Sequence, residues 1–259
     1  MNGFIKMNCI WALLLVLAVT SCTRKENARM IWDMNTDWAF YRGGDMKHGE
    51  DVDLDDSRWM YSSYYAVGKE TLRGDVIYDG IGWYRRYFKL PENYADKRIA
   101  VSFEGVMNAC ELFVNGHKVT EHKGGYIGFT SDISDYINWN GNNLLALRVS
   151  AEYDSLTPPG KPQDRLDFYY YSGIYRDVKM IITDKLHISD ELENDDFVGS
   201  GLFITYPKVE KEEAQVSVRT GLKNGHQDIR NGILQSVLRD EKGKVWLHIR
   251  CRLPVLPIM

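Results

Sequence analysis

Large apolar residues alternate with small or polar ones, at a period of two, through much of the chain. Residues 98–104 carry their large apolar side chains at the odd positions, and Leu145, Leu147 and Val149 alternate with smaller or polar neighbours in the same way. A period of two places successive side chains on opposite faces, so each segment is predicted to be a strand with one buried face. Helical periodicity is scarce, and we expect one short helical turn at residues 131–136.

Asn115 and Gly116 separate two strand-like runs, at residues 112–114 and 117–119. A type I′ turn needs positive φ at both central residues, and the Asn-Gly pair supplies it at low cost, so we predict a β-hairpin here. Turn signals recur about every ten residues, which favours an antiparallel sandwich or jelly roll over a βαβ fold. This first domain is placed at residues 30–185.

A second alternating pattern follows a polar break at residues 190–196. Four strands are expected, at residues 201–206, 214–222, 233–238 and 245–248. An immunoglobulin-like sandwich needs about seven strands and about 100 residues, so residues 186–259 are predicted to form an incomplete immunoglobulin-like β-sandwich. Residues 250–259 contain Pro254 and Pro257 and lose the alternation, and we expect a frayed or frame-shifted end there.

The first residues have the features of a secretory leader. Lys6 precedes an apolar stretch at residues 10–19, which is too short for a permanent membrane span but suits the core of a signal peptide. Two small residues stand directly before Cys22, as in a bacterial lipobox, and residues 23–29 form a polar tether. We therefore expect residues 1–22 to be a lipoprotein signal, with acylated Cys22 anchoring the protein in the cell envelope of a bacterium, at the outer membrane or in the periplasm. The alternative is an ordinary signal peptide with a coincidental cysteine.

The composition is that of a globular protein. The chain has 259 residues, of which 44% are hydrophobic and 12% aromatic, and its net charge is −4. No basic block gives an electrostatic footprint for nucleic acid, so none is expected as a partner. The histidines and cysteines show no metal-ligand spacing, and no metal site is predicted. Cys110 is expected to be a buried small hydrophobe, and His117, beside the hairpin turn, to be exposed.

Four short segments carry a resemblance to a known family. They are GWYRRYF at 82–88, FEGV at 103–106 leading to VNG at 114–116, GGYIGF at 124–129 followed by DI at 132–133 and GNNL at 141–144, and SGIYRDV at 172–178. In this order they resemble the N-terminal sugar-binding domain of glycoside hydrolase family 2, which includes β-galactosidases, β-glucuronidases and β-mannosidases. The match covers residues 30–222. The family's Pro-His-Asp-Trp stretch before the first segment is replaced here by SSYYAV at 62–67.

The resemblance implies a jelly-roll domain, an immunoglobulin-like domain and then a (β/α)8 barrel that holds both catalytic glutamates, one of them in an Asn-Glu dipeptide. No Asn-Glu dipeptide occurs in this sequence, and too few residues follow the first domain for the roughly 250 that a barrel needs. We therefore expect the chain to be the N-terminal part of a retaining, β-galactosidase-like exo-glycosidase that acts on oligosaccharides or galactosides. By itself the chain is expected to be inactive.

Asp167 is the residue that the resemblance marks for substrate binding. It lies five residues before the SGIYR motif, where an aspartate of family members reaches the active site, hydrogen-bonds the sugar and in some β-galactosidases helps to hold a sodium ion. A carboxylate accepts hydroxyl hydrogens and coordinates hard cations, so a sodium or magnesium ion is an expectation for the full-length enzyme only, and no cofactor is expected for this chain. Asp79, three residues before Gly82, is a looser candidate. The alternative for Asp167 is a loop aspartate that caps a turn.

Other hypotheses stay open. The tyrosines at 169–171 either stack on sugar or divide between core and surface. The chain is alternatively a non-catalytic carbohydrate-binding lipoprotein, although a half-finished second sandwich argues against this because unpaired strand edges invite aggregation. A third hypothesis is an interaction subunit that a separately encoded barrel completes. Nothing in the sequence sets the oligomeric state.

Overall fold

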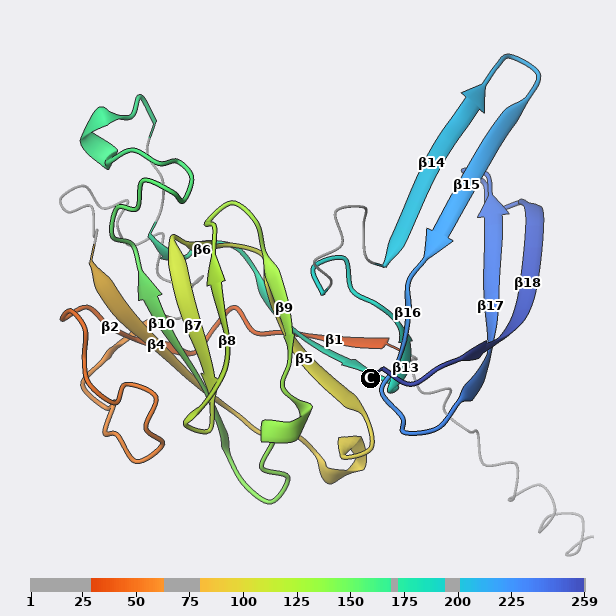
Figure 1. Ribbon diagram of the computed structural model, residues 1–259. Helices are drawn as coiled ribbons and strands as arrows, with labels where there is room; N and C mark the ends of the chain where they lie inside the picture. The colour runs from red at the N-terminus through yellow and green to blue at the C-terminus, as the bar shows by residue number, and fades with distance from the viewer. Residues whose placement is uncertain (1–28, 63–79, 169–171, 194–200, 259) are drawn as a thin grey trace, which may run out of the picture.

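The computed structural model describes residues 29–62, 80–168, 172–193 and 201–258 (Figure 1). These residues form strands, loops and short 3-10 helices, arranged as a larger first unit and a smaller second unit. The predicted all-β class is confirmed. Among the described residues, no helix combines the length and the apolar character that crossing a bilayer requires.

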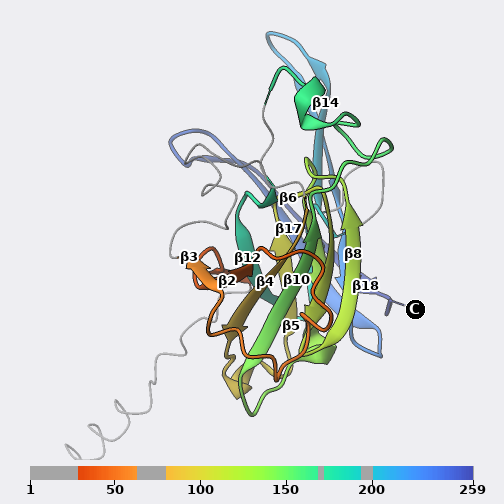
Figure 2. The same cartoon turned by 90° about the vertical axis from the view of Figure 1, so that its left-hand side faces the viewer.

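Two antiparallel sheets form the first unit (Figures 1 and 2). Sheet A contains, in spatial order, β1 (Arg29–Asp33), β12 (Val178–Thr183), β5 (Arg98–Phe103) and β9 (Phe129–Asp132). Sheet B contains β3 (Met60–Ser62), β2 (Trp38–Tyr41), β4 (Ile81–Phe88), β10 (Asn143–Ser150), β7 (Ala109–Val114) and β8 (His117–Lys123). The chain passes repeatedly from one sheet to the other, as in a jelly roll.

The main core lies between these two sheets. Ile99 and Val101 of β5 and Leu145 and Leu147 of β10 are fully buried in one apolar cluster, as their alternation predicts. Cys110 of β7 belongs to the same cluster, and burial raises the pKa of its thiol. The expectation of a small buried hydrophobe at this position is confirmed.

The predicted hairpin and helical turn are both present. Asn115 and Gly116 join β7 to β8 with φ values of +50° and +83°, and His117 is exposed. The helical turn is shorter than predicted: η3 covers Ser134–Tyr136, because β9 occupies the residues before it.

Strand β5 is buried on both faces, so the prediction that one face is open is wrong. Arg98 and Ser102, on the face away from the core, are 4% and 5% exposed. Arg98 Nη2 lies 3.1 Å from Glu193 Oε1, and the Thr130 hydroxyl lies within hydrogen-bond distance of both Ser102 Oγ (2.9 Å) and Asp190 Oδ1 (3.2 Å). Alternation identifies an outward face, but another part of the chain covers it here.

Glu193 is the centre of this contact between the two units. Its Oε1 lies 3.1 Å from Lys223 Nζ and 3.6 Å from His187 Nε2, in addition to the contact with Arg98, and its Oε2 accepts the Asp190 N–H at 2.9 Å. Burial acts to raise the pKa of Glu193, but His187, the Asp190 N–H and the two cations outweigh it and lower that pKa well below its usual range. The carboxylate is therefore ionised at neutral pH.

The second unit consists of three two-stranded sheets in the described residues. They are β13 (Leu186–Ile188) with β16 (Leu222–Asn224), β14 (Leu202–Val209) with β15 (Ala214–Thr220), and β17 (Arg230–Arg239) with β18 (Val245–Val255). The four predicted strands are present with different ends. The sequence did not predict the short strands β13 and β16, which pair with each other.

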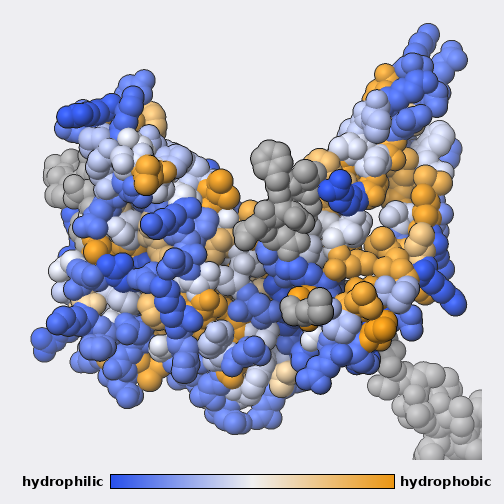
Figure 3. All heavy atoms as spheres, viewed as in Figure 1, coloured by the Kyte–Doolittle hydropathy of each residue, from blue (hydrophilic) through white to orange (hydrophobic). Residues whose placement is uncertain are grey.

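One face of the β17–β18 hairpin is apolar and open. Leu238 stands opposite Leu247 and Ser236 stands opposite Ile249, with Leu247 51% and Ile249 49% exposed. Apolar residues gather on this unit in the space-filling view (Figure 3). A sandwich buries such a face against a second sheet, so the unit has the pattern of the predicted incomplete immunoglobulin-like sandwich.

The expectation of a frayed end at residues 250–259 is wrong for most of that segment. β18 continues to Val255, which is 9% exposed and whose carbonyl accepts a hydrogen bond from Asn224 Nδ2 at 2.9 Å. Pro254 stands opposite Asn231 within the pairing. In a two-stranded sheet half of the N–H groups face an open edge, where a proline is tolerated, so Pro254 does not end the strand.

A buried arginine of β4 ties a long loop to sheet B. The Arg85 side chain is fully buried; its Nε donates to Asp56 Oδ2 at 2.8 Å, and its Nη1 donates to the carbonyls of Gly49 (2.8 Å) and Asp51 (2.7 Å). Its Nη2 donates to Tyr87 Oη at 2.8 Å. The fixed fork of a guanidinium matches several acceptors at once, so one side chain organises the loop between β2 and β3.

We expect Arg85→Lys to lower the free energy of unfolding by about 2–4 kcal/mol, because one ammonium cannot reach all these acceptors and leaves buried carbonyls unpaired. Arg148→Lys is the matched control: Arg148 bonds Asp45 at 2.7 Å but its side chain is 24% exposed. The control is expected to cost less than about 1 kcal/mol. Urea unfolding followed by tryptophan fluorescence measures both, and equal losses would contradict the role given to Arg85.

Candidate functional site

The loop at residues 151–168 carries the first candidate site residue, Asp167. It follows β10 and stands out beyond the sheets at one end of the sandwich in both views (Figures 1 and 2). At its start the Ala151 N–H donates to the Gly80 carbonyl at 3.0 Å, which holds the loop beside the entry to β4. The site's position is thus set by sheet B.

Asp154 shapes the first turn of this loop. Its Oδ1 accepts the Leu156 N–H at 2.9 Å, and its Oδ2 accepts the Thr157 hydroxyl at 2.7 Å. The hydrogen bond from the Leu156 N–H lowers the pKa of Asp154 the most, and the bond from the Thr157 hydroxyl lowers it further. Thr157 is buried, so the base of the loop is ordered and its outer part is presented to solvent.

Asp167 is exposed near the far end of the loop, two residues beyond the short helix η4 (Gln163–Arg165). Within the described part of the chain its carboxylate forms no hydrogen bond or ion pair, so it does not cap a turn there. Both carboxylate oxygens remain available to accept hydrogen bonds from sugar hydroxyl groups. The structure thus places Asp167 at the surface, on the loop that follows β10.

The motif segments found in the sequence contact one another where the chain continues after this loop. Strand β11 (Gly173–Ile174) of the SGIYR segment pairs with β6 (Val106–Met107) of the FEGV segment. Tyr175 donates its hydroxyl to the Gly125 carbonyl at 2.7 Å and its N–H to the Gly105 carbonyl at 3.2 Å. Tyr175 thus joins three of the four segments, and burial raises the pKa of its phenol.

The fourth segment, GWYRRYF, is joined through Tyr84. Gly173 has a φ of +78°, and a Cβ atom there would stand 1.8 Å from Tyr84 Oη. Only glycine fits, because the position needs both a left-handed backbone and the absence of a side chain. The four motifs are therefore parts of one support for the chain that follows residues 169–171.

His122 was not singled out from the sequence. Its Nε2 lies 3.1 Å from the Gly124 carbonyl and 3.0 Å from the Ile127 carbonyl, and its ring stacks on Phe129 at 4.7 Å. It fixes the GGYIGF loop, whose Ile127 side chain is 67% exposed. The only sequence signal is its place two residues before that motif.

The remaining predicted site residues divide into two groups. Asp79, Cys22 and the tyrosines at 169–171 lie outside the described residues. In the SGIYRDV segment, the Arg176 guanidinium lies 5.2 Å from the Tyr175 ring centre. Asp177 accepts a hydrogen bond from Asn35 Nδ2 at 3.3 Å and lies 3.9 Å from Lys179 Nζ, so it is a structural ion-pair partner. In the described ranges no three His, Cys, Asp or Glu side chains gather as a metal site would need.

Comparison with known proteins shows which family the chain resembles. Residues 71–184 match the family model described as glycosyl hydrolases family 2, sugar binding domain. The β-galactosidase of Thermoanaerobacter pseudethanolicus is 32% identical over 219 residues, which are 82% of this chain and 27% of that enzyme. A putative β-glucuronidase of Formosa agariphila is 30% identical over 250 residues, covering 93% of this chain and 27% of that protein.

The solved structures give the same fold. Bacteroides uniformis β-glucuronidase 2, covalently bound to cyclophellitol-6-carboxylate aziridine, superposes with a TM-score of 0.79 at 26% identity. That match covers 88% of this chain and 26% of the other. The chain spans about a quarter of the length of the relatives that it matches.

We expect Gly173→Ala to lower the free energy of unfolding by about 3 kcal/mol or more, because the new methyl group meets the Tyr84 hydroxyl in addition to the backbone strain. Gly116→Ala is the control, since its φ of +83° is similar but a Cβ atom there meets nothing closer than 3.9 Å. The control is expected to lose only about 1 kcal/mol. Equal losses in thermal and urea unfolding would refute the close approach of Gly173 and Tyr84.

Proposed function

The chain belongs to glycoside hydrolase family 2 through its sugar-binding domain, and on this premise we propose that the protein is a β-galactosidase-type glycosidase acting on oligosaccharides. The chain's own contribution is the jelly-roll scaffold and one substrate contact, Asp167. Retaining hydrolysis uses two carboxyl groups about 5 Å apart on rigid elements. We assign these to the part of the enzyme beyond this chain, in keeping with its quarter share of the relatives' length.

The observation that carries this assignment is the carboxylate of Asp167, which is exposed and forms no hydrogen bond or ion pair with the residues that the structure describes. It stands on a loop whose base is fixed by Asp154 and Ala151, and the four motif segments support the chain that follows it. A carboxylate accepts hydrogen bonds from two neighbouring hydroxyl groups, which are present on every hexose ring. Such a contact orients the sugar without taking part in bond cleavage.

β-Glucuronidase activity is the second candidate, because relatives and solved structures of that name match the chain over most of its length. The two substrates differ in charge, since a glucuronide carries a carboxylate at C6. An anionic Asp167 hydrogen-bonds hydroxyl groups well and repels a carboxylate at short range. A contact of Asp167 with the group at C6 would therefore favour the galactoside, whereas a contact with the ring hydroxyl groups serves both substrates.

The test is an Asp167→Asn change in the polypeptide that the complete gene encodes, assayed with chromogenic β-galactoside and β-glucuronide. We expect kcat/KM for the preferred substrate to fall tenfold or more, because a hydrogen bond to a charged acceptor contributes about 1.5–3 kcal/mol. Asp164→Asn, on the same loop and also exposed, is the control and is expected to change kcat/KM by less than about twofold.

An unchanged kcat/KM in Asp167→Asn would refute the proposed contact between Asp167 and the substrate. Turnover of either substrate by the 259-residue chain alone would refute the assignment of the catalytic carboxyl groups to the part of the enzyme beyond it. This chain alone is expected to show no turnover. The ratio of activities on the two substrates decides between the galactosidase and the glucuronidase.

We propose further that the protein is held at the cell envelope by lipid on Cys22. The apolar stretch at residues 10–19 and the small residues before Cys22 support this. Cys22→Ser is expected to abolish incorporation of a labelled fatty acid and to release the protein from the membrane fraction. Cys9→Ser, within the proposed leader, is the control. Fatty-acid labelling that survives Cys22→Ser would disprove the anchor.

A further inference from the structure

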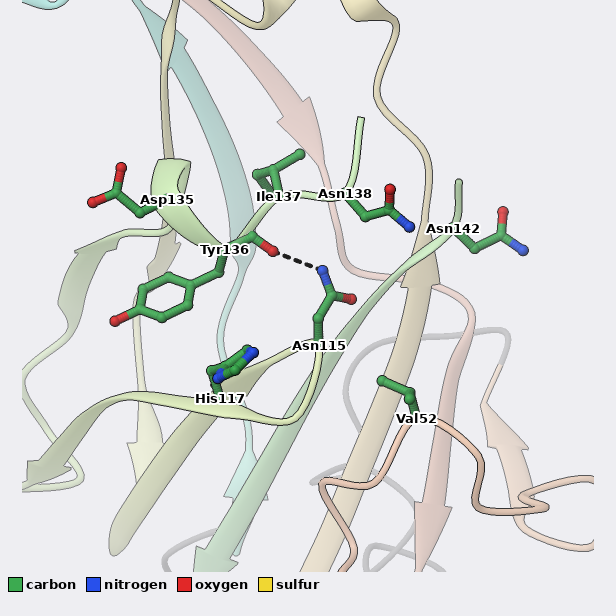
Figure 4. Close-up of a pocket in the computed structure, with 8 residues that line it drawn as sticks. All are labelled: Val52, Asn115, His117, Asp135, Tyr136, Ile137, Asn138 and Asn142. Atoms are coloured by element: carbon green, nitrogen blue, oxygen red, sulfur yellow. Dashed lines mark hydrogen bonds between the residues drawn. The ribbon is translucent and has the colours of Figure 1, made fainter. Parts of the chain in front are cut away.

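A concave site lies at the end of sheet B opposite to the Asp167 loop. It is a pocket of about 610 Å³, lined among others by Asn115, His117, Asp135, Tyr136, Asn138 and Asn142 (Figure 4). These residues come from the β7–β8 turn, from η3 and from the loop that leads into β10. None of them was assigned a role from the sequence beyond the turn itself.

The strand β10 separates this pocket from the loop that carries Asp167. Its first residue, Asn143, adjoins the pocket, and its last residue, Ser150, leads into the loop at 151–168. Eight residues of extended chain place these two ends about 24 Å apart. A ligand in the pocket is therefore distinct from one that contacts Asp167.

Two asparagines build a rigid frame for the pocket. Asn115 Nδ2 donates to the Tyr136 carbonyl (2.7 Å) and to Asn143 Oδ1 (2.8 Å), while its Oδ1 accepts the Leu144 N–H (2.8 Å). Asn143 in turn accepts the Asn138 N–H at 2.7 Å and donates to the Asn138 carbonyl at 3.1 Å. Each amide forms three hydrogen bonds, so this part of the wall is held in place before any ligand arrives.

The remaining polar side chains are free to bind a ligand. Asp135 and Asn142 are exposed and form no hydrogen bond within the part of the chain that the structure describes. Asn138 uses its Oδ1 to accept the Asn140 N–H at 3.1 Å, which leaves its amino group as a donor. Asp135 lines the pocket beside Tyr136, whereas Asn138 and Asn142 line its other end (Figure 4). The pocket therefore offers acceptors and donors at separate points, and a ligand with several hydroxyl groups can use both.

Aromatic rings form the other half of the pocket. The rings of His117 and Tyr136 lie 6.0 Å apart with an angle of 35° between their planes. Figure 4 shows them on one side of Asn115, with the amides of Asn138 and Asn142 on the other. An apolar ring face beside polar groups suits a ligand with one C–H face and a hydroxylated edge.

Charge narrows the class of ligand. The residues that line the pocket include the carboxylate of Asp135 and no lysine or arginine among those that the structure describes. An anionic ligand would meet repulsion without a compensating cation. The volume, within the usual range for small-ligand sites, accommodates one or two hexose rings.

We propose that this pocket is a non-catalytic binding site for a neutral sugar unit. It holds a glycan at the end of the jelly roll away from Asp167 and needs no residue of the proposed substrate contact. The Arg85-anchored loop contributes Val52 to its rim, so the same buried arginine that stabilises sheet B also shapes this site.

The test is an NMR titration of the 259-residue chain with galactose, mannose and cellobiose, and with glucuronic acid as the anionic comparison. At least one neutral sugar is expected to bind saturably, with shifts centred on residues 115–117 and 135–142, and glucuronic acid to bind more weakly. The double variant Asp135→Ala/Asn142→Ala is expected to weaken binding at least fivefold, because it removes two groups that bond hydroxyls. Asn140→Ala, an exposed asparagine of the same loop outside the pocket, is the matched control and is expected to bind normally.

Asp167→Asn is expected to leave this titration unchanged, so failure of the substrate contact and failure of the pocket give different results. The proposal is overturned if no neutral sugar binds saturably up to about 50 mM, well above the millimolar dissociation constants expected of weak sites. It is also overturned if binding survives the double variant in a chain whose circular dichroism is native. Shifts confined to the loop at residues 151–168 would likewise reject it.

Discussion

The pairing of β10 with β4 on one side and β7 on the other is the constraint on which the rest of the structure depends. Leu147 of β10 stands opposite Tyr84 and Leu112, and all three are buried in the main core, while Ala146 is buried on the other face of sheet B. A slip of one residue would exchange these two faces. The two ends of β10 lead to the Asp167 loop and to the polar pocket, so its register fixes both sites.

The motif residues that join the segments and the proposed substrate contact are different sets. Tyr84, Gly173 and Tyr175 are motif residues, and their contacts include one another's segments, as between Tyr84 and Gly173 and between Tyr175 and the Gly125 carbonyl. Asp167 lies outside every motif and is exposed on a loop. A rigid scaffold that presents variable loops supports several specificities, which accounts for galactosidases and glucuronidases among the relatives of one fold.

Much of the first unit could be predicted from local patterns, and the failures have a common cause. Alternation at Leu145 and Leu147 and the Asn115-Gly116 turn gave correct strands because neighbouring residues determine both. The burial of Arg98 on the outer face of β5 could not be predicted, since Glu193 covers it from a distant part of the chain. The end of β18 was misjudged because prolines were given more weight than the continuing alternation of Ile249, Cys251 and Leu253 with basic residues. The pocket arises from three separate segments, and no single stretch of sequence contains it.

A structure of the complete polypeptide, with a galactose- or glucuronate-derived inhibitor bound covalently at the catalytic centre, tests the central claim most directly. The account predicts a sugar hydroxyl oxygen at about 2.6–3.0 Å from an Asp167 carboxylate oxygen, with the chain from residue 172 to 178 still packed against Gly105 and Gly125. A sugar bound more than about 10 Å from Asp167, beyond the reach of a hydrogen bond or a bridging water, would contradict it.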